Sequence, residues 1–134
     1  MASLRSKIET ALAAALAGVG ADVYQGIASD DKVLPCIIVR AASAEEDMVN
    51  SGNYRVVCEI TVKDNAGSDS TFDGLCEAVR AVVKTDEFAS GLTSDGLHVW
   101  GVAAAESVEW GTSGDTWTET RQIEIICAPS TFPA

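Results

Sequence analysis

The sequence predicts an α+β domain in which a mostly antiparallel β-sheet carries two α-helices on one face. Three observations predict it. The chain has 134 residues, a length that suits one hydrophobic core. Its apolar residues recur with helical spacing in two segments and with strand-like patterns in the segments between them. Its last third holds two long strand-like segments joined by Gly111-Thr112-Ser113-Gly114, which predicts a C-terminal β-hairpin.

The first helix is predicted to begin after Ser3, which can cap it, and to end at Gly18 and Gly20. Its apolar stripe comprises Leu4, Ile8, Ala11, Leu12, Ala15 and Leu16. Two basic residues ahead of this Ala/Leu run imitate a signal peptide. Glu9 and Thr10 stand where the apolar region would begin, so the spacing favours an amphipathic helix.

Three strand-like segments follow. A short one spans Val23 to Ile27, and Val33 to Arg40 is an almost continuous apolar run in which Pro35 restricts pairing to a strand end or an edge. The segment Ala41 to Val49 is acidic and weakly patterned. After the turn signal Asn50-Ser51-Gly52-Asn53, apolar and polar residues alternate from Tyr54 to Lys63, which predicts a half-buried strand.

The second helix is predicted to begin at Thr71 or Asp73 and to end near Lys84 or Thr85. Its apolar side comprises Phe72, Leu75, Cys76, Val79, Val82 and Val83. Strands from Leu97 to Trp110 and from Asp115 to Cys127 then form the hairpin. We therefore assign residues 1–128 to one domain and 129–134 to a loose C-terminal tail.

The hairpin carries the most functional information. If its turn is Ser113-Gly114, the strands pair Trp110 with Trp117, Val108 with Glu119, Glu106 with Arg121, Ala104 with Ile123 and Val102 with Ile125. This register places an aromatic pair, an opposite-charge pair and an apolar base on one face. Because the strands are unusually long, we expect the outer half to project beyond the core. Its tryptophans either cap the core or form an interface with a partner.

Charge and cysteine usage exclude several classes of function. Nine basic against 20 acidic residues give a net charge of −11, the opposite of the basic surface that binds nucleic-acid phosphates. No apolar run approaches the about 20 residues that span a bilayer, so we expect a soluble protein. The four cysteines lack the paired spacing of zinc ligands and are expected to be buried free thiols: Cys36, Cys58, Cys76 and Cys127.

Local catalytic and cofactor motifs are missing from the sequence. It has no Walker-type phosphate loop, zinc-protease motif, nucleophile elbow or calcium loop, and Gly18-Val19-Gly20 lacks the third glycine of a dinucleotide fingerprint. His98 lacks an identifiable carboxylate partner, and Glu45-Glu46-Asp47 is typical of a solvated acidic loop. We expect no catalytic residue, no cofactor and no metal.

The order of these segments resembles that of a known family. A helix, VLPCIIVR, a turn marked SGN, YRVVCEITV, a second helix and a tryptophan-bearing hairpin together resemble the tail terminator proteins of long-tailed bacteriophages, over about Ser3 to Ala128. The resemblance implies a ring, usually a hexamer, at the head-proximal end of the virion's tail, assembled in the host cytoplasm. Such a ring stops tube polymerisation and provides the surface to which the head and neck attach.

The resemblance also implies partners: further copies of the chain, the tail tube protein and a neck or head-completion protein. DNA passes through the pore without specific binding, and an acidic wall suits this because it repels the strand. The regions expected to make contacts are the hairpin and the turn from Asp47 to Tyr54; the candidate interface residues are Trp110, Trp117, Glu106, Arg121, Asn53 and Tyr54. Alternatives are another head-tail connector, or a small α+β ligand-binding module or enzyme.

Overall fold

A computed structural model describes residues 3–25, 35–46, 53–65, 69–84, 88–93, 97–113 and 115–129. Along the chain its elements are α1 (Leu4–Leu16), β1 (Asp22–Gln25), β2 (Cys36–Glu46), β3 (Tyr54–Asn65), α2 (Asp69–Val83), α3 (Phe88–Leu92), β4 (Leu97–Ser113) and β5 (Thr116–Pro129). The predicted α+β class is therefore confirmed.

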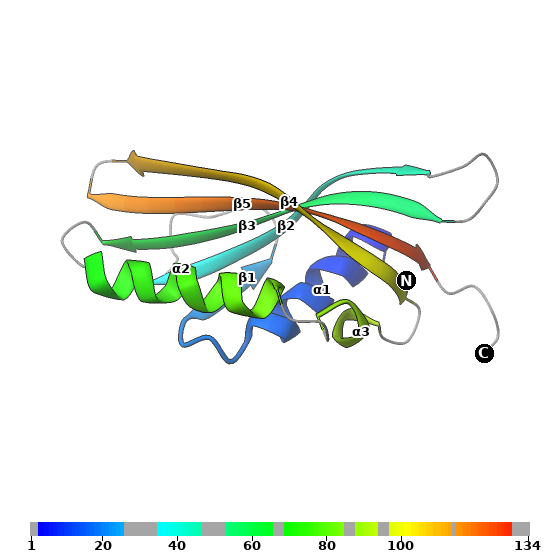
Figure 1. Cartoon of the computed structure of the whole chain (residues 1–134), viewed down its shortest axis with the longest axis horizontal. Coiled ribbons are helices and arrows are strands. Elements are labelled where there is room, and N and C mark those ends of the chain that lie inside the picture. The colour runs from blue at the N-terminus through cyan, green and yellow to red at the C-terminus, as the bar shows by residue number, and fades with distance from the viewer. Residues whose placement is uncertain are drawn as a thin grey trace.

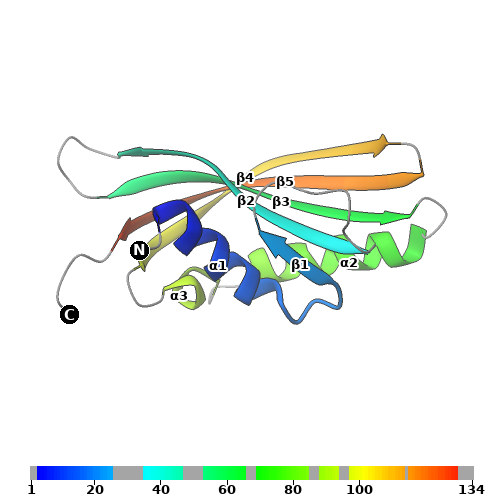
Figure 2. The ribbon, with the colours of Figure 1, turned by 180° about the vertical axis from the view of Figure 1, so that it is seen from behind.

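The described strands form one five-stranded sheet in the order β1-β2-β3-β5-β4. Only β1 and β2 pair in parallel, so the expectation of a mostly antiparallel sheet is also confirmed. Figure 1 shows the sheet strongly twisted with the helices on one side of it, and Figure 2 shows the same arrangement from behind. α2 lies beneath the half of the sheet that carries the β4–β5 turn, whereas α1 and α3 lie beneath the other half.

The core lies between the sheet and these helices. On β3, Val56, Cys58, Ile60 and Val62 are buried and alternate with more exposed residues, as their spacing predicts. The opposite face of the sheet is polar at its centre, where Arg40 contacts Glu59 at 2.9 Å and Arg55 contacts Glu124 at 3.1 Å. One face of the sheet is thus apolar beneath the helices, and the other carries cross-strand ion pairs.

The helices begin and end for local reasons. The Ser3 hydroxyl accepts the N–H of Ser6 at 3.1 Å, which caps α1 as predicted, and Gly20 has a positive φ of 105° beyond its end. α2 begins at Asp69, slightly earlier than predicted. α3 was not predicted, because its five residues are too few to show a helical repeat. Its Phe88 and Leu92 are buried in the core.

β2 is longer than its apolar run. It continues to Glu46 through the acidic segment that lacked a strand pattern, and its pairing with β3 shifts register between Ala41 and Ser43. The shift, a β-bulge, breaks the alternation on which a strand prediction depends. Residues 47–52 of the predicted turn lie outside the described part of the chain.

The predicted register of the β4–β5 hairpin is correct at its base and wrong at its outer half. Val102 pairs with Ile125 as expected, but the register shifts between Ala103 and Ser107. Beyond the shift the pairs are Val108 with Arg121, Trp110 with Glu119 and Thr112 with Trp117, so Trp110 does not face Trp117 and Arg121 does not face Glu106. The last pair before the turn is Ser113 with Thr116, whereas the expected turn at Ser113-Gly114 would make it Thr112 with Asp115.

The C-terminal boundary also differs from the prediction. β5 extends to Pro129, which pairs with Leu97, and Ala128 pairs with His98. Proline is tolerated here because it stands at the last position of the strand. The first residue assigned to the tail therefore belongs to the sheet, and residues 130–134 lie outside the described part of the chain.

Candidate interaction site

The outer half of the hairpin holds two tryptophans in different environments. Trp110 lies on β4, an edge strand of the sheet, and is 74% exposed. Trp117 lies on β5, is partly buried against the core, and makes an edge-to-face contact with Phe72 of α2 at a centroid distance of 6.0 Å. Trp117 thus packs the hairpin against α2, whereas the indole of Trp110 is exposed to solvent.

A pocket of about 420 Å³ opens between the first turns of α2 and the end of the hairpin. It is lined by Phe72, Asp73, Trp110, Gly111, Thr112, Trp117 and Thr118. The hydroxyl of Thr118 donates to the carbonyl of Gly111 at 3.3 Å, which holds the two strands together at its rim. Its size falls within the usual range of ligand pockets, and three of its seven lining residues are aromatic.

Buried polar groups fix Trp110 in place. Its Nε1–H donates to Oε2 of Glu119 at 2.9 Å, and the other carboxylate oxygen of Glu119 contacts Arg121 at 3.2 Å. Glu119 and Arg121 are only 6% and 7% exposed. Since the indole N–H is held from below by a charged acceptor, the orientation of the ring is constrained while its faces stay open.

The same carboxylate lies beside a buried thiol. Burial, together with the negative charge of Glu119 and a hydrogen bond to it, raises the pKa of Cys76 in α2 to about 12. Burial also raises the pKa of Cys58 to about 12 and that of Cys127 to about 11. All four cysteines are buried and free, as expected from their positions, and the three with raised pKa values are poor nucleophiles at neutral pH.

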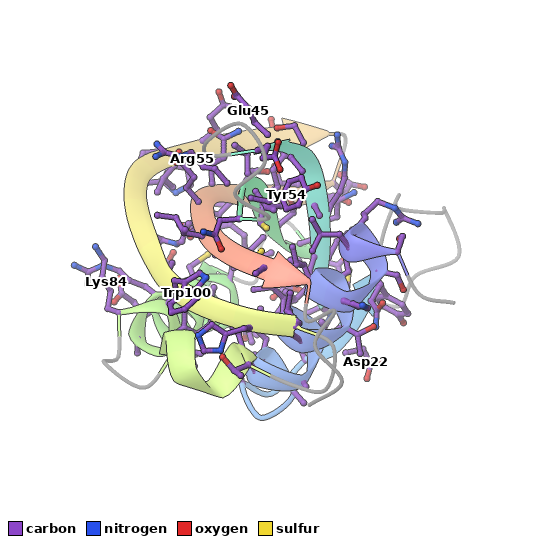
Figure 3. The ribbon with its side chains drawn as sticks, turned by 90° about the vertical axis from the view of Figure 1, so that its right-hand side faces the viewer. Asp22, Glu45, Tyr54, Arg55, Lys84 and Trp100 are labelled. Atoms are coloured by element: carbon purple, nitrogen blue, oxygen red, sulfur yellow. The ribbon has the colours of Figure 1, made fainter. Side chains whose placement is uncertain are left out.

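A second exposed aromatic lies at the other end of β4. Trp100 is 63% exposed, donates from Nε1 to the side-chain oxygen of Asn53 at 3.0 Å, and packs edge-to-face with His98 at 4.2 Å. Figure 3 shows Trp100 extending from β4, and it shows Glu45 of β2 and Arg55 of β3 at a distance from it. The ring contact that the structure gives for His98 is therefore an edge-to-face contact with an exposed indole.

The predicted site residues fall into two groups. Trp110, Trp117 and Arg121 lie together at the outer hairpin, although Arg121 is buried and pairs with Glu119 instead of Glu106. Asn53 and Tyr54 lie at the opposite end, where Asn53 joins Trp100. Of Glu106 the structure gives only its place on β4.

Sequence reasoning missed three contributors: Phe72, Asp73 and Trp100. Phe72 and Asp73 stand at the start of a predicted helix, where an apolar residue and an acidic one are both ordinary. Nothing in their spacing links them to a hairpin nearly 40 residues later. Trp100 stands in an apolar segment, and the structure places it on the exposed side of β4, directly after buried Val99 and at the register shift between Val99 and Gly101.

The described residues contain no group of three or more His, Cys, Asp or Glu side chains placed to hold a metal ion. Among the helices described, none is long and apolar enough to cross a membrane. No protein-family model matches the chain, and no curated protein is significantly similar to it.

Proposed function

We propose that this chain is a structural subunit of a bacteriophage tail, forming a ring that caps the tail tube, stops its polymerisation and offers a surface for the head and neck. The support is the resemblance in the order and character of the segments, together with the α+β fold. In this proposal, the helices on one face of the sheet and the long C-terminal hairpin form the frame from which subunit contacts are made.

The observation that carries the proposal is the exposed β4 edge with its tryptophans. β4 has 17 residues and, among the described strands, pairs with β5 alone, so its other edge lies at the border of the described sheet. Trp110 and Trp100 are 74% and 63% exposed on this one strand. An unpaired edge strand and exposed large aromatic side chains both promote aggregation of an isolated domain. A neighbouring subunit that covers the edge pairs the strand and buries the aromatic side chains.

The acidic charge fits the proposed setting. Each chain has a net charge of −11, so a ring of such subunits has a strongly negative field. This field repels DNA, which must pass through the pore without adhering. This argument concerns the sign of the charge alone and assigns no residue to the pore.

Native mass spectrometry and light scattering of the purified chain, alone and with the tube protein of the same tail, test the proposal. We expect a closed ring, usually of six subunits, either alone or on the tube, and shorter tubes when the chain is added during polymerisation. A chain that remains monomeric in both conditions and leaves tube length unchanged contradicts the proposal.

Two matched variants test the β4 edge. Trp110→Ser and Trp100→Ser each remove one exposed indole from the same strand, and Glu77→Ala removes an exposed side chain from α2 as a control. We expect at least one tryptophan variant to lose the ring while its circular dichroism spectrum stays folded. If both assemble as well as Glu77→Ala, the β4 edge is not the subunit interface.

A further inference from the structure

The pocket between α2 and the hairpin combines aromatic walls with a carboxylate. Trp110, Trp117 and Phe72 supply three rings, and Asp73 is an exposed acidic residue at the rim. The described residues that line it include no lysine or arginine. Aromatic faces together with a carboxylate attract organic cations, because the ring face and the carboxylate both present negative charge.

The charge behind the walls has the same sign. Glu119 lies beneath Trp110, and Asp64 pairs across the strands with Trp117, where it is 2% exposed and one of its carboxylate oxygens has no hydrogen-bond partner among the described residues. Asp73 lines the pocket, and the carboxylates of Glu119 and Asp64 lie behind its walls. The guanidinium of Arg121 is the one positive charge among these groups, and it is already engaged by Glu119.

The chemistry of the lining favours a guanidinium over an ammonium group. A planar guanidinium stacks on an indole face and still directs N–H groups sideways at a carboxylate, whereas an ammonium acts as a compact, strongly hydrated point charge. The indole N–H of Trp110 points to Glu119, so its faces remain available for stacking. A volume of about 420 Å³ also admits the aliphatic stem of an arginine.

The charge of this chain favours a guest from a different protein. All five arginines of this chain contact a carboxylate of their own chain: Arg5 with Glu9, Arg40 with Glu59, Arg55 with Glu124, Arg80 with Glu77 and Arg121 with Glu119. A second copy would need to break one of these pairs and would bring a further charge of −11. A partner with an arginine on a basic surface complements both the pocket and the net charge.

We propose that the pocket of Phe72, Asp73, Trp110 and Trp117 binds an arginine side chain of a second, different protein. The guanidinium stacks on Trp110 and hydrogen-bonds to Asp73, and its stem packs on Trp117 and Phe72. Within the proposed function, on which this identification of the partner rests, that protein is an assembly neighbour of the ring, and the contact between subunits along β4 is made at Trp100, away from this pocket. Recognition of arginine is a property of the isolated chain and is testable without assembly.

The test titrates the purified chain with N-acetyl-arginine methylamide and, in parallel, with the citrulline analogue, which has nearly the same shape but no charge. The readouts are the indole N–H resonances of the three tryptophans and the dissociation constant from their shifts. We expect the arginine probe to shift the Trp110 and Trp117 resonances, and the citrulline probe to bind about tenfold more weakly or not at all. Equal binding of both probes, or no binding at millimolar concentrations, overturns the proposal.

Variants locate the site. Asp73→Asn and Trp110→Leu are expected to weaken binding of the arginine probe by about threefold to tenfold. Trp100→Leu, which removes another exposed indole from the same strand, should leave the affinity unchanged. An unchanged affinity in Asp73→Asn and Trp110→Leu contradicts the proposed site. If the chain binds arginine in this pocket but forms no ring, this inference stands and the proposed function is refuted. If it forms a ring but does not bind arginine, the proposed function stands and this inference is refuted.

Discussion

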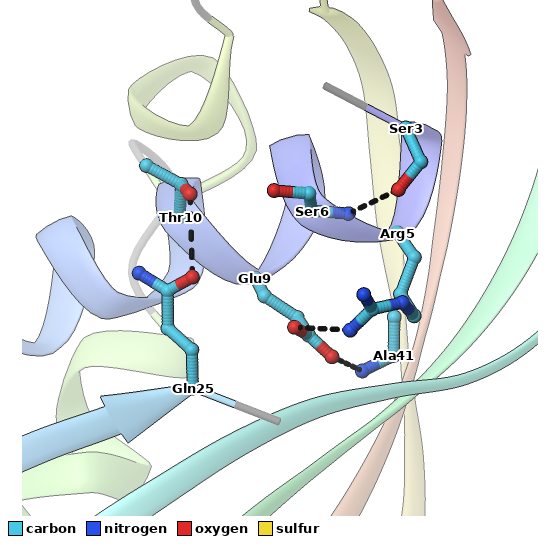
Figure 4. A network of polar contacts seen from close by, with 7 residues as sticks. All are labelled: Ser3, Arg5, Ser6, Glu9, Thr10, Gln25 and Ala41. Carbon is cyan, nitrogen blue, oxygen red and sulfur yellow. Dashed lines mark hydrogen bonds and ion pairs between the residues drawn. The ribbon is translucent and has the colours of Figure 1, made fainter. Parts of the chain in front are cut away.

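The carboxylate of Glu9 in α1 accepts the backbone N–H of Ala41 in β2 at 3.0 Å, immediately before the register shift in that strand. Figure 4 shows the carboxylate between Arg5, which contacts its other oxygen at 2.9 Å, and Ala41. Glu9 is only 2% exposed, although it lies on a surface helix. A charged acceptor on α1 thus replaces a strand partner where the ladder is interrupted, and fixes the position of the helix on the sheet.

Glu9→Ala is therefore expected to lower the free energy of unfolding by about 1–3 kcal/mol, because it leaves a buried backbone N–H without its acceptor. Urea denaturation followed by circular dichroism measures this change. Arg5→Ala should cost less than Glu9→Ala, because the arginine side chain is 61% exposed and water can take its place, while the bond from the buried Glu9 carboxylate to Ala41 remains. Equal losses in both variants would show that the ion pair, and not the bond to Ala41, holds the helix.

The two hairpin tryptophans should respond differently to truncation. Trp117→Ala is expected to lower the free energy of unfolding by roughly 3 kcal/mol, because it removes the ring that packs on Phe72 and the core. Trp110→Ala should cost about 1 kcal/mol, mainly through the lost hydrogen bond to Glu119. Chemical denaturation of both variants gives the comparison. A larger loss for Trp110 would place it in the core and remove it from the proposed contact surface.

These contrasts show what the sequence could and could not predict. The alternation from Val56 to Val62 and the spacing of Ile8, Leu12 and Leu16 predict one strand and one helix correctly, because a single period extends through each element. Prediction of the hairpin succeeded at Val102 and Ile125 but failed at Trp110. A register shift inside β4 leaves no mark in a local pattern, yet it changes every pair beyond it.

The candidate site was predictable only in part for a related reason. Two exposed-looking tryptophans in a long hairpin indicate a contact surface, and this prediction remains to be tested. The pocket itself depends on Phe72 and Asp73, which reach the hairpin only because α2 crosses beneath it. Such a juxtaposition is a property of the tertiary packing, so no spacing along the chain indicates it.

The buried pair of Glu119 and Arg121 should be costly to break on one side. Arg121→Met leaves the buried carboxylate without its cation and is expected to lower the free energy of unfolding by about 3–5 kcal/mol. The double variant Glu119→Gln with Arg121→Met should recover part of this loss, because no uncompensated charge remains. A thermodynamic cycle of the two single variants and the double variant measures the coupling. Additive losses would indicate that the two groups contribute independently.

The raised thiol pKa values predict a loss of stability at alkaline pH. An unfolded cysteine ionises near its ordinary pKa of 9.0, whereas Cys58 and Cys76 hold their protons to about 12 and Cys127 to about 11. Above pH 9 the unfolded chain therefore binds fewer protons than the folded one, and the free energy of unfolding falls as the pH rises. It should be insensitive to these thiols below pH 9.

Denaturation curves at pH 7, 9 and 10 test this dependence. Because lysine and tyrosine also titrate in this range, the control is a variant with alanine at positions 58, 76 and 127, whose decline with pH should be shallower whatever its stability at pH 7. In the native wild-type chain, a thiol reagent at pH 8 should label these cysteines far more slowly than in urea. Rapid labelling without denaturant would contradict their burial.

The glycines that end α1 offer a matched pair for the backbone. Gly20 has a φ of 105°, in the region that side chains with a Cβ rarely adopt, whereas Gly18 does not, and neither would place a Cβ against a neighbouring atom. Gly20→Ala is expected to cost about 1–2 kcal/mol from backbone strain alone. Gly18→Ala should be neutral or slightly stabilising, since alanine restricts the unfolded chain more than glycine does. The urea midpoints of the two variants measure this difference in stability. Equal midpoints would mean that the connection from α1 to β1 does not require a positive φ at position 20.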